Sequence, residues 1–301
     1  MPKMATPAME ACAKRQGKKA GKSSPWRDVV RRLIKSKSAM LGLAIVLILI
    51  VIACFPQVFA PDGMDEQNYA DQFLPPSLRH LMGTDNLGRD IFSRVIYGAQ
   101  VSMRVGLISV GLACIVGGML GALAAYYGGR TDNIIMRAMD IMLAIPSILL
   151  SISIAAALGP GLFNMMVAIG LGNVPVYARV VRAAIMTVKE QEYVEAGRAI
   201  GASTVRLIFC HMLPNAMAPI IVQATLGVAS AILSAAGLSF LGLGIQPPTP
   251  EWGAMLSAGR QYIRDAWWIV TFPGLTIMVT IFALNLLGDG LRDALDPRLK
   301  R

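Results

Sequence analysis

The chain has 301 residues, of which 55% are hydrophobic and only 15% are charged, and its mean hydropathy is +0.56. Soluble domains typically carry about 25% charged residues, so this composition excludes an ordinary soluble protein as well as a disordered or collagen-like one. Four cysteines without CxxC spacing argue against a zinc site or a disulfide framework, and the net charge of +10 is concentrated before the first apolar segment.

The N-terminal region has two parts. Residues 1–24 are rich in Lys, Ala, Gly and Ser, which predicts a disordered cytoplasmic tail. Residues 25–37 carry an apolar stripe at helical spacing among arginines and lysines, formed by Trp26, Val29, Val30 and Leu33. This pattern predicts an interfacial amphipathic helix that contacts anionic membrane lipids. A plain cluster of positive charges next to the first span explains the same residues equally well.

Long uncharged segments predict the membrane spans. They cover residues 38–61, 105–129, 141–178 and 266–288. About 20 apolar residues cross the hydrocarbon core as a helix, so each segment holds at least one span. The third is too long for one helix, and the turn signal Gly159-Pro160-Gly161 divides it into spans at about 138–158 and 162–181. With a further span at 216–237, the sequence predicts an all-α polytopic membrane protein with six transmembrane helices.

The positive charges predict the orientation of these spans. With the N-terminus inside, 22 of the 28 lysines and arginines fall on the inner side, and the charge balance is +12 inside and −2 outside. Both termini are therefore expected in the cytoplasm. The predicted organisation is a first transmembrane helix at 38–61, an outer loop at 62–100, a core domain with five transmembrane helices at 101–288, and an inner C-terminal tail at 289–301. A stripe of Gly117, Gly121 and Ala125 predicts close helix packing in the second span.

Catalytic and nucleotide-binding motifs are missing from the sequence. It contains no GxxxxGK[ST] loop for phosphates, its two histidines fall on opposite sides of the membrane, and Ser239 misses the spacing of a nucleophile elbow. Energy for an active process must then come from a partner or an ion gradient. Arg137 and Asp140, spaced i, i+3 at an inner helix end, favour a structural ion pair over a role in transport.

The longest inner loop, residues 189–215, has the pattern of two short helices joined by a sharp corner. Residues 190–200 are helical in pattern, with acids in the first turn. Gly201 is placed to be the left-handed residue after that helix, and Ser203 is placed to cap a second helix that Pro214 closes. The loop is therefore a candidate docking element, and an ordinary loop helix is the alternative.

An outer segment rich in proline precedes the last span. Pro247, Pro248 and Pro250 restrict its backbone, and Glu251 and Trp252 follow them. Pro247, Pro248, Glu251 and Trp252 are therefore candidates for a contact with an outer partner or for a gate. A stiff connector that only orients the last span is equally consistent with these residues.

The inner loop resembles the EAA loop of ABC importer permeases. The matching residues are Glu195, Ala196, Gly197, Gly201, Ala202 and Pro214, with Gly197 in place of the usual alanine. Further stretches resemble dipeptide and oligopeptide permeases, among them Gly83-Thr84-Asp85, Gly88-Arg89-Asp90, Gln246–Gly253 and Gly288–Pro297. The resemblance covers about residues 33–300 and is strongest to the C-type subunit.

This resemblance implies a type I ABC importer permease fold in a bacterial inner membrane. It implies a heterodimer with a B-type permease subunit, two ATPase subunits that bind ATP and Mg, and a periplasmic or lipid-anchored substrate-binding protein. The chain itself would carry no cofactor, no catalytic site and no nucleic acid. The implied cargo is dipeptides or oligopeptides, with glutathione, D-amino-acid dipeptides or nickel chelates as alternatives. An ion-coupled secondary carrier and a structural membrane subunit are alternatives of a different class.

Overall fold

The computed structural model describes residues 25–295, so the predicted tail 1–24 and the residues after 295 lie outside the described residues. The described chain is helical, and its one β-bridge pairs Thr84 with Asp90. Its longer helices are α2 (Pro25–Lys35), α3 (Lys37–Cys54), α5 (Ile91–Tyr127), α6 (Gly129–Leu143), α7 (Ser147–Leu158), α8 (Leu162–Lys189), α9 (Glu192–Ala199), α11 (Met217–Phe240), α12 (Trp252–Gly259) and α13 (Trp268–Leu295). Short turns are α4 (Pro56–Phe59), η1 (Tyr69–Asp71), α10 (Thr204–Arg206), η2 (Leu207–Met212), η3 (Pro214–Ala216) and η4 (Arg260–Tyr262).

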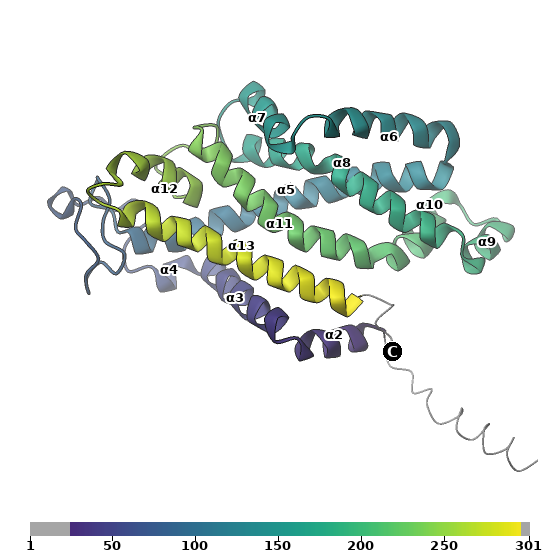
Figure 1. The fold of residues 1–301 in the computed structure, drawn as a ribbon, viewed down its shortest axis with the longest axis horizontal. Helices are drawn as coiled ribbons and strands as arrows, with labels where there is room; N and C mark the ends of the chain where they lie inside the picture. Colours follow the sequence, from purple (N-terminus) through teal and green to yellow (C-terminus); the bar gives the residue numbers. More distant parts are fainter. Residues whose placement is uncertain (1–24, 296–301) are drawn as a thin grey trace, which may run out of the picture.

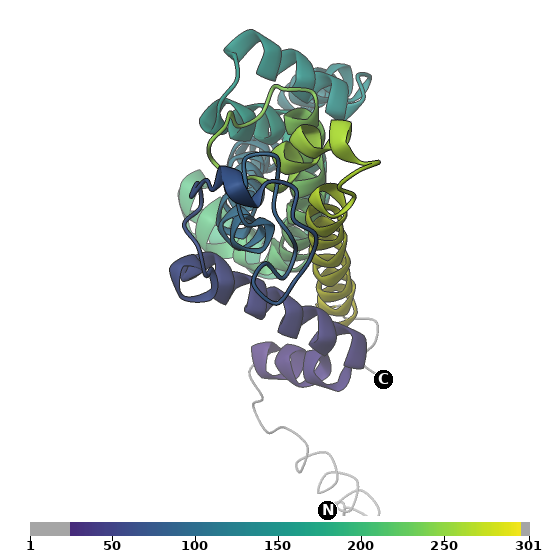
Figure 2. The ribbon, with the colours of Figure 1, turned by 90° about the vertical axis from the view of Figure 1, so that its left-hand side faces the viewer.

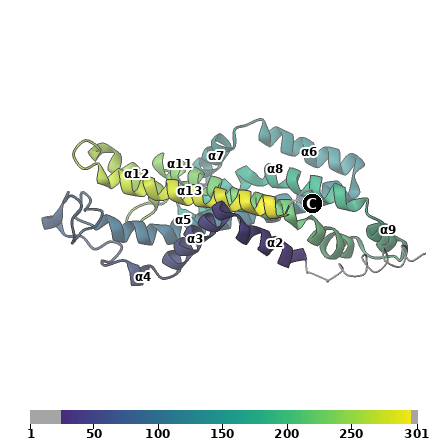
Figure 3. The same cartoon turned by 60° about the horizontal axis from the view of Figure 1, so that its bottom comes forward.

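The long helices form an elongated bundle whose two ends differ (Figure 1). The loop between α4 and α5 lies with α12 at one end, and α9 and α10 lie at the other. Viewed from the first end, α2 and α3 lie on one side of the bundle and α6 and α7 on the opposite side (Figure 2). Figure 3 shows α13 running along the bundle beside α3. The loops that could meet partners therefore gather at the two ends.

Within residues 25–295, four helical segments are long and apolar enough to cross a membrane. They are α3, α5, the continuous segment Thr204–Phe240 and α13, and α6 with α7 makes a fifth if that bent pair is one span. Helix α8 is not among them, although it is 28 residues long. Its polar Asn164 and Asn173 and the arginines of its inner half lower its mean hydropathy. Length and composition thus support four or five spans, and the predicted number of six is not established by them.

The predicted span at about 138–158 is not one continuous helix. Helix α6 ends at Leu143, α7 starts at Ser147, and the two helices are bent by 88°. Pro146 explains the break, because proline lacks an N–H and disfavours helical geometry in the residue before it. The backbone of Pro146 is extended, with ψ at 131°.

Helices α5 and α8 form the central pair of the bundle. A Cβ at Gly117 would lie 2.5 Å from the Val174 carbonyl oxygen, and one at Gly121 would meet the Ala178 carbonyl even more closely. The missing side chains therefore let the two backbones touch, and the predicted packing role of this glycine stripe is confirmed.

The predicted N-terminal amphipathic helix is present as α2. It ends before Ser36, whose hydroxyl accepts a hydrogen bond from the Ala39 N–H at 3.4 Å and caps α3. Val30 and Ile34 are more than half exposed next to Arg27 and Arg31, so apolar and cationic groups share one open face. Contact of this face with lipids stays a prediction.

Candidate functional site

The inner loop turns sharply at Gly201, as the sequence predicts. Gly201 has φ +80°, its N–H donates to the Arg198 carbonyl at 2.9 Å, and the Ala202 N–H donates to the Gly197 carbonyl at 3.0 Å. These two bonds make a Schellman motif, in which a left-handed residue closes a helix and satisfies its last carbonyls. The corner after α9 is therefore a defined structure.

Pro214 does not close the second helix, contrary to the prediction. Ser203 caps that helix as expected, accepting from the Arg206 N–H at 3.4 Å. The chain then continues through the π-helical turn η2, where the Leu213 N–H donates to the Ile208 carbonyl at 2.8 Å. The wider turn shifts the hydrogen-bond register, and Pro214 falls at the first position of η3, where its missing N–H is tolerated. The second helix of the loop thus runs into the membrane segment that ends at Phe240.

One face of the inner loop packs against α5 and α8. Val194 of α9 is fully buried, and Ile208 and Met212 of η2 join it in one apolar cluster with Ala122 and Ile185. A Cβ at Gly197 would lie 2.9 Å from Leu207 Cδ2. The glycine that departs from the usual alanine thus sits where α9 and η2 approach closely.

The opposite face of the same loop is exposed. The side chains of Glu195, Ala196 and Pro214 are exposed, and so are three apolar ones, with Ile200 85%, Val205 66% and Tyr193 44% exposed. Apolar groups of this size at a helical corner next to a carboxylate are typical of a surface that meets another protein. The described geometry therefore presents the predicted docking residues outward.

The proline-rich segment Gln246–Gly253, here called the outer connector, is held onto the start of α5. The indole N–H of Trp252 donates to the Val95 carbonyl at 3.0 Å, and both Glu251 carboxylate oxygens accept from the first N–H groups of α12, Gly253 at 2.9 Å and Ala254 at 2.8 Å. Trp252 is 0% and Glu251 1% exposed. The prediction that these two side chains contact an outer partner is therefore wrong for this conformation, because one anchors α12 in the core and the other caps it.

Pro247 and Pro248 are exposed. The Pro248 carbonyl accepts from Arg94 Nη1 at 3.5 Å, and the same nitrogen donates to the Met64 carbonyl at 3.0 Å. One arginine at the outer end of α5 therefore joins the loop before α5 to the proline-rich connector. The two prolines stay a candidate contact surface.

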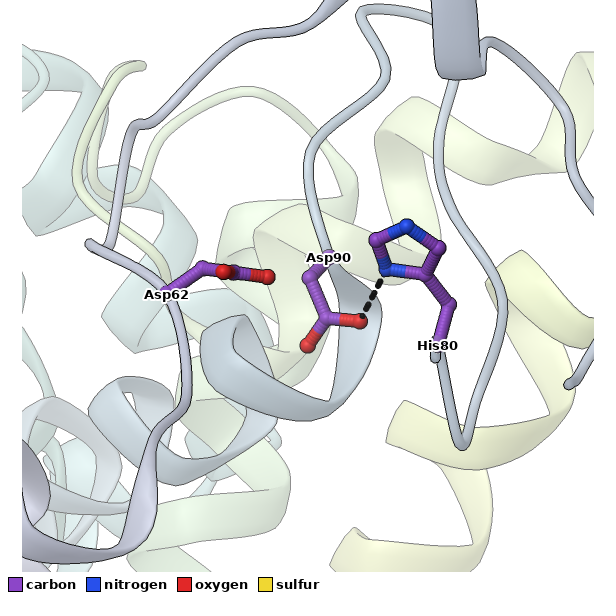
Figure 4. Close-up of side chains that lie close together, drawn as sticks. All are labelled: Asp62, His80 and Asp90. Atoms are coloured by element: carbon purple, nitrogen blue, oxygen red, sulfur yellow. Dashed lines mark hydrogen bonds and ion pairs between the residues drawn. The ribbon is translucent and has the colours of Figure 1, made fainter. Parts of the chain in front are cut away.

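A buried His–Asp pair fixes the first turn of α5 (Figure 4). Asp90 Oδ2 accepts from the Ser93 N–H at 2.7 Å as the N-cap of α5, and Asp90 Oδ1 lies 3.0 Å from His80 Nδ1. Asp62 approaches Asp90 from the other side, with ligand-type atoms of all three residues within 4.8 Å of one another. Burial, and then the nearby Asp90 carboxylate, raise the pKa of Asp62. Because both Asp90 oxygens already accept hydrogen bonds, the arrangement is a helix anchor.

The predicted Arg137–Asp140 ion pair is also wrong. Asp140 on α6 pairs with Arg179 on α8 at 2.5 Å, and Asp132 binds Arg182 through two hydrogen bonds of 2.5 and 2.6 Å. Within residues 25–295, Arg137 forms no ion pair with Asp140. These two ion pairs join α6 to α8. Their partners lie 39 and 50 positions apart in sequence, so residue spacing along a single helix cannot predict them.

Comparison with known proteins identifies the family. Residues 117–301 match the family described as "Binding-protein-dependent transport system inner membrane component", and residues 24–76 match the "N-terminal TM domain of oligopeptide transport permease C". The chain belongs to the first of these families. As a member it is a transmembrane transport subunit of a bacterial inner membrane and not an enzyme, and it carries no cofactor of its own.

Close relatives of this transport component are known in several bacteria. The dipeptide transport system permease protein DppC of Alkalihalophilus pseudofirmus is 50% identical over 92% of this chain and 91% of its own. The di/tripeptide permease DppC of Pseudomonas aeruginosa is 51% identical over 92% and 93%. The glutathione permease GsiD of Escherichia coli is 45% identical over 92% of each chain.

The fold is shared with a solved transporter. An inward-facing structure of the MetNI methionine ABC transporter aligns with a TM-score of 0.54 over 67% of this chain and 96% of that chain, at 18% identity. At this identity the likeness shows the fold alone, which confirms an ABC importer permease fold.

Proposed function

We propose that this subunit moves dipeptides or oligopeptides across the inner membrane as the C-type half of an ATP-driven importer. The observation that carries the substrate class is the identity of about half of all aligned residues, over nine-tenths of both chains, with two permeases named for dipeptides. The glutathione permease is almost as similar, so the peptide assignment rests on an experiment that compares these substrates directly.

The proposed partners are a B-type permease subunit, two ATPase subunits and a periplasmic or lipid-anchored binding protein. The geometry of the inner loop 189–215 supports a contact with an ATPase. One apolar face of the loop packs on α5 and α8, while Glu195 and Ile200 on the opposite face are exposed. Nucleotide-driven closure of the ATPases would push this loop, and the differential contacts of the closed assembly would favour an outward-open form. Exposed Pro247 and Pro248 are proposed to face the binding protein.

The proposed topology has six membrane crossings and both termini inside. The six crossings would be α3, α5, the bent pair α6–α7, α8, Thr204–Phe240 and α13. Leu78 in the loop before α5 is 99% exposed, and native Cys210 in η2 is also exposed at the opposite end of the bundle. In intact cells, an impermeant thiol reagent should label a cysteine introduced at Leu78 as the sole cysteine, and it should spare a second variant in which native Cys210 is the sole cysteine. Labelling of Cys210 with protection at Leu78 would invert the topology.

The transport assignment is tested with the reconstituted complex. Proteoliposomes that contain this chain, its permease partner and both ATPases should accumulate a labelled dipeptide when ATP and loaded binding protein are supplied. Unlabelled dipeptide should compete strongly, while glutathione, a D-amino-acid dipeptide and a nickel chelate should not. Stronger competition by one of those three would reassign the substrate, and ATP-independent uptake by this chain alone would support an ion-coupled carrier instead.

A further inference from the structure

We propose that Tyr126, at the inner end of α5, is a positioning residue that carries movements of the inner loop into α5. The inference rests on the proposed coupling of this loop to an ATPase. It names the residue through which the loop acts on a membrane-spanning helix.

Three successive parts of the loop converge on Tyr126. Lys189 Nζ, at the end of α8, donates to the Ala125 and Tyr126 carbonyl oxygens at 2.9 and 2.8 Å. The guanidinium carbon of Arg198, in the last turn of α9, lies 5.3 Å from the centroid of the Tyr126 ring. The Thr204 hydroxyl, on the other side of the corner, donates to the Tyr126 hydroxyl at 3.3 Å.

These contacts differ in chemistry and act on different atoms of Tyr126. Lys189 satisfies carbonyls that the end of a helix leaves without partners. Arg198 lies over the ring, where a cation is attracted to the aromatic face. Thr204 uses the hydroxyl. Because Arg198 precedes and Thr204 follows the Gly201 corner, Tyr126 holds both sides of that corner against one helix end.

The same helix reaches the outer connector. Helix α5 has 37 residues, which at 1.5 Å per residue span about 55 Å. Near its outer end, the Val95 carbonyl accepts from Trp252 and Arg94 donates to the Pro248 carbonyl. A displacement imposed at Tyr126 can therefore reach the outer connector through one continuous helix, and a rigid helix is one of the elements that carry coupling between distant sites.

Attachment of the loop does not depend on Tyr126 alone. The buried cluster of Val194, Ile208, Met212 and Ala122 holds the loop on the bundle through apolar packing. Removal of the Tyr126 side chain should therefore leave the loop folded and able to bind an ATPase. The contacts of Arg198 and Thr204 with the helix end are then lost, while the hydrogen bonds from Lys189 to backbone carbonyls remain. This separation makes the proposal testable.

The test uses the complete transporter with a cysteine introduced at exposed Gln246 in the outer connector, in a background without other cysteines. The measurement is the rate at which this cysteine reacts with an impermeant thiol reagent, with and without ATP and vanadate. Tyr126→Leu removes ring and hydroxyl, and Tyr126→Phe removes the hydroxyl alone. Tyr127→Leu is the matched control: Tyr127 is 59% exposed, and its ring packs edge-on against the Tyr126 ring at a centroid distance of 5.2 Å, so this variant removes that ring contact and leaves the three loop contacts of Tyr126 in place. Uptake per ATP hydrolysed and co-purification of the ATPases are measured on the same preparations.

We expect a nucleotide-dependent change of labelling rate in the parent that Tyr127→Leu retains and Tyr126→Leu loses. Tyr126→Phe should keep most of it, and uptake per ATP should fall several-fold in Tyr126→Leu only. The proposal is overturned if Tyr126→Leu keeps the change, if Tyr127→Leu loses it equally, or if the parent shows none. Should Tyr126→Leu fail to assemble, Arg198→Gln, which removes only the cation over the ring, must reduce the change in the same direction. Because labelling needs no peptide, a failure of the substrate assignment would appear in the uptake assay alone.

Discussion

Substitution of Gly201 changes the backbone conformation at the corner of the inner loop without removing any side-chain contact. Gly201 has φ +80°, and a Cβ added there would meet no atom within 4 Å. The cost of a larger residue is therefore purely conformational, about 1–2 kcal/mol for an L-residue forced into the left-handed region. That cost corresponds to a factor of roughly 5–30 in the population of the folded corner.

A graded series makes this expectation sharp. Gly201→Asn should cost least because asparagine tolerates left-handed geometry, Gly201→Ala should cost more, and Gly201→Val should cost most because its β-carbon is branched. The control is Gly111→Ala in α5, where added atoms also meet nothing within 4 Å but the backbone is an ordinary helix. Alanine there should be neutral or slightly stabilising.

The assay is ATPase co-purification and binding-protein-stimulated hydrolysis for each variant at equal expression. Retained ATPase should decrease in the order parent, Asn, Ala, Val, while Gly111→Ala matches the parent. Trypsin cleavage after exposed Arg198 and Arg206 should accelerate in the same order. Equal behaviour of Gly201→Val and the parent in both measurements would refute the role of the corner.

Three further predictions follow from the described contacts. Glu195→Lys should reduce ATPase co-purification without lowering the thermal midpoint of the chain, because an exposed ion pair contributes only about 0–1 kcal/mol to folding stability. Glu192→Lys on the same exposed helix is the control. Equal losses of ATPase in both variants would remove any special role of Glu195. Trp252→Ala should destabilise the complex by about 3–5 kcal/mol, because it empties a fully buried site; weaker binding-protein stimulation with an unchanged thermal midpoint would instead make Trp252 a contact residue. The pKa of Asp62 is raised in the folded protein, so the stability that this group contributes is present below its ordinary pKa of 3.8 and is lost as pH rises through the folded-state pKa. Asp62→Asn should therefore raise the thermal midpoint at pH 7.5, and this gain should shrink toward pH 4. A gain that does not depend on pH would exclude ionisation of Asp62 as its cause.

Local rules predicted the inner loop well because its geometry depends on neighbours in sequence. A glycine directly after the acid-rich predicted helix 190–200, followed two positions later by a serine, is enough to indicate the Gly201 corner and the Ser203 cap. The same rules failed at Pro214, since the π-helical turn that accommodates this proline is stabilised by the packing of Ile208 and Met212 against α5 and α8.

Long-range contacts account for the other differences. Nothing near Asp140 in sequence indicates that Arg179 is its partner, because the 88° bend after α6 sets how α6 lies against α8. Trp252 looks like a surface aromatic in a proline-rich segment. It is buried because its ring packs on α5 at Gly98, and its N–H finds an acceptor in the Val95 carbonyl, 157 positions away. The His80–Asp90 anchor was likewise not predicted, since ten positions separate its members in an irregular loop.

The most direct test of the central claim places a photo-crosslinking amino acid at Ile200, which is 85% exposed at the tip of the inner loop, in the assembled transporter in intact cells. The same amino acid at Leu78, 99% exposed in the outer loop, is the control for the opposite side of the membrane. Ile200 should crosslink to an ATPase subunit in a nucleotide-dependent manner, and Leu78 should not crosslink to it under any condition. A crosslink from Leu78 to an ATPase, or none from Ile200 in a complex that hydrolyses ATP and transports peptide, would contradict the assignment of this loop as the coupling element.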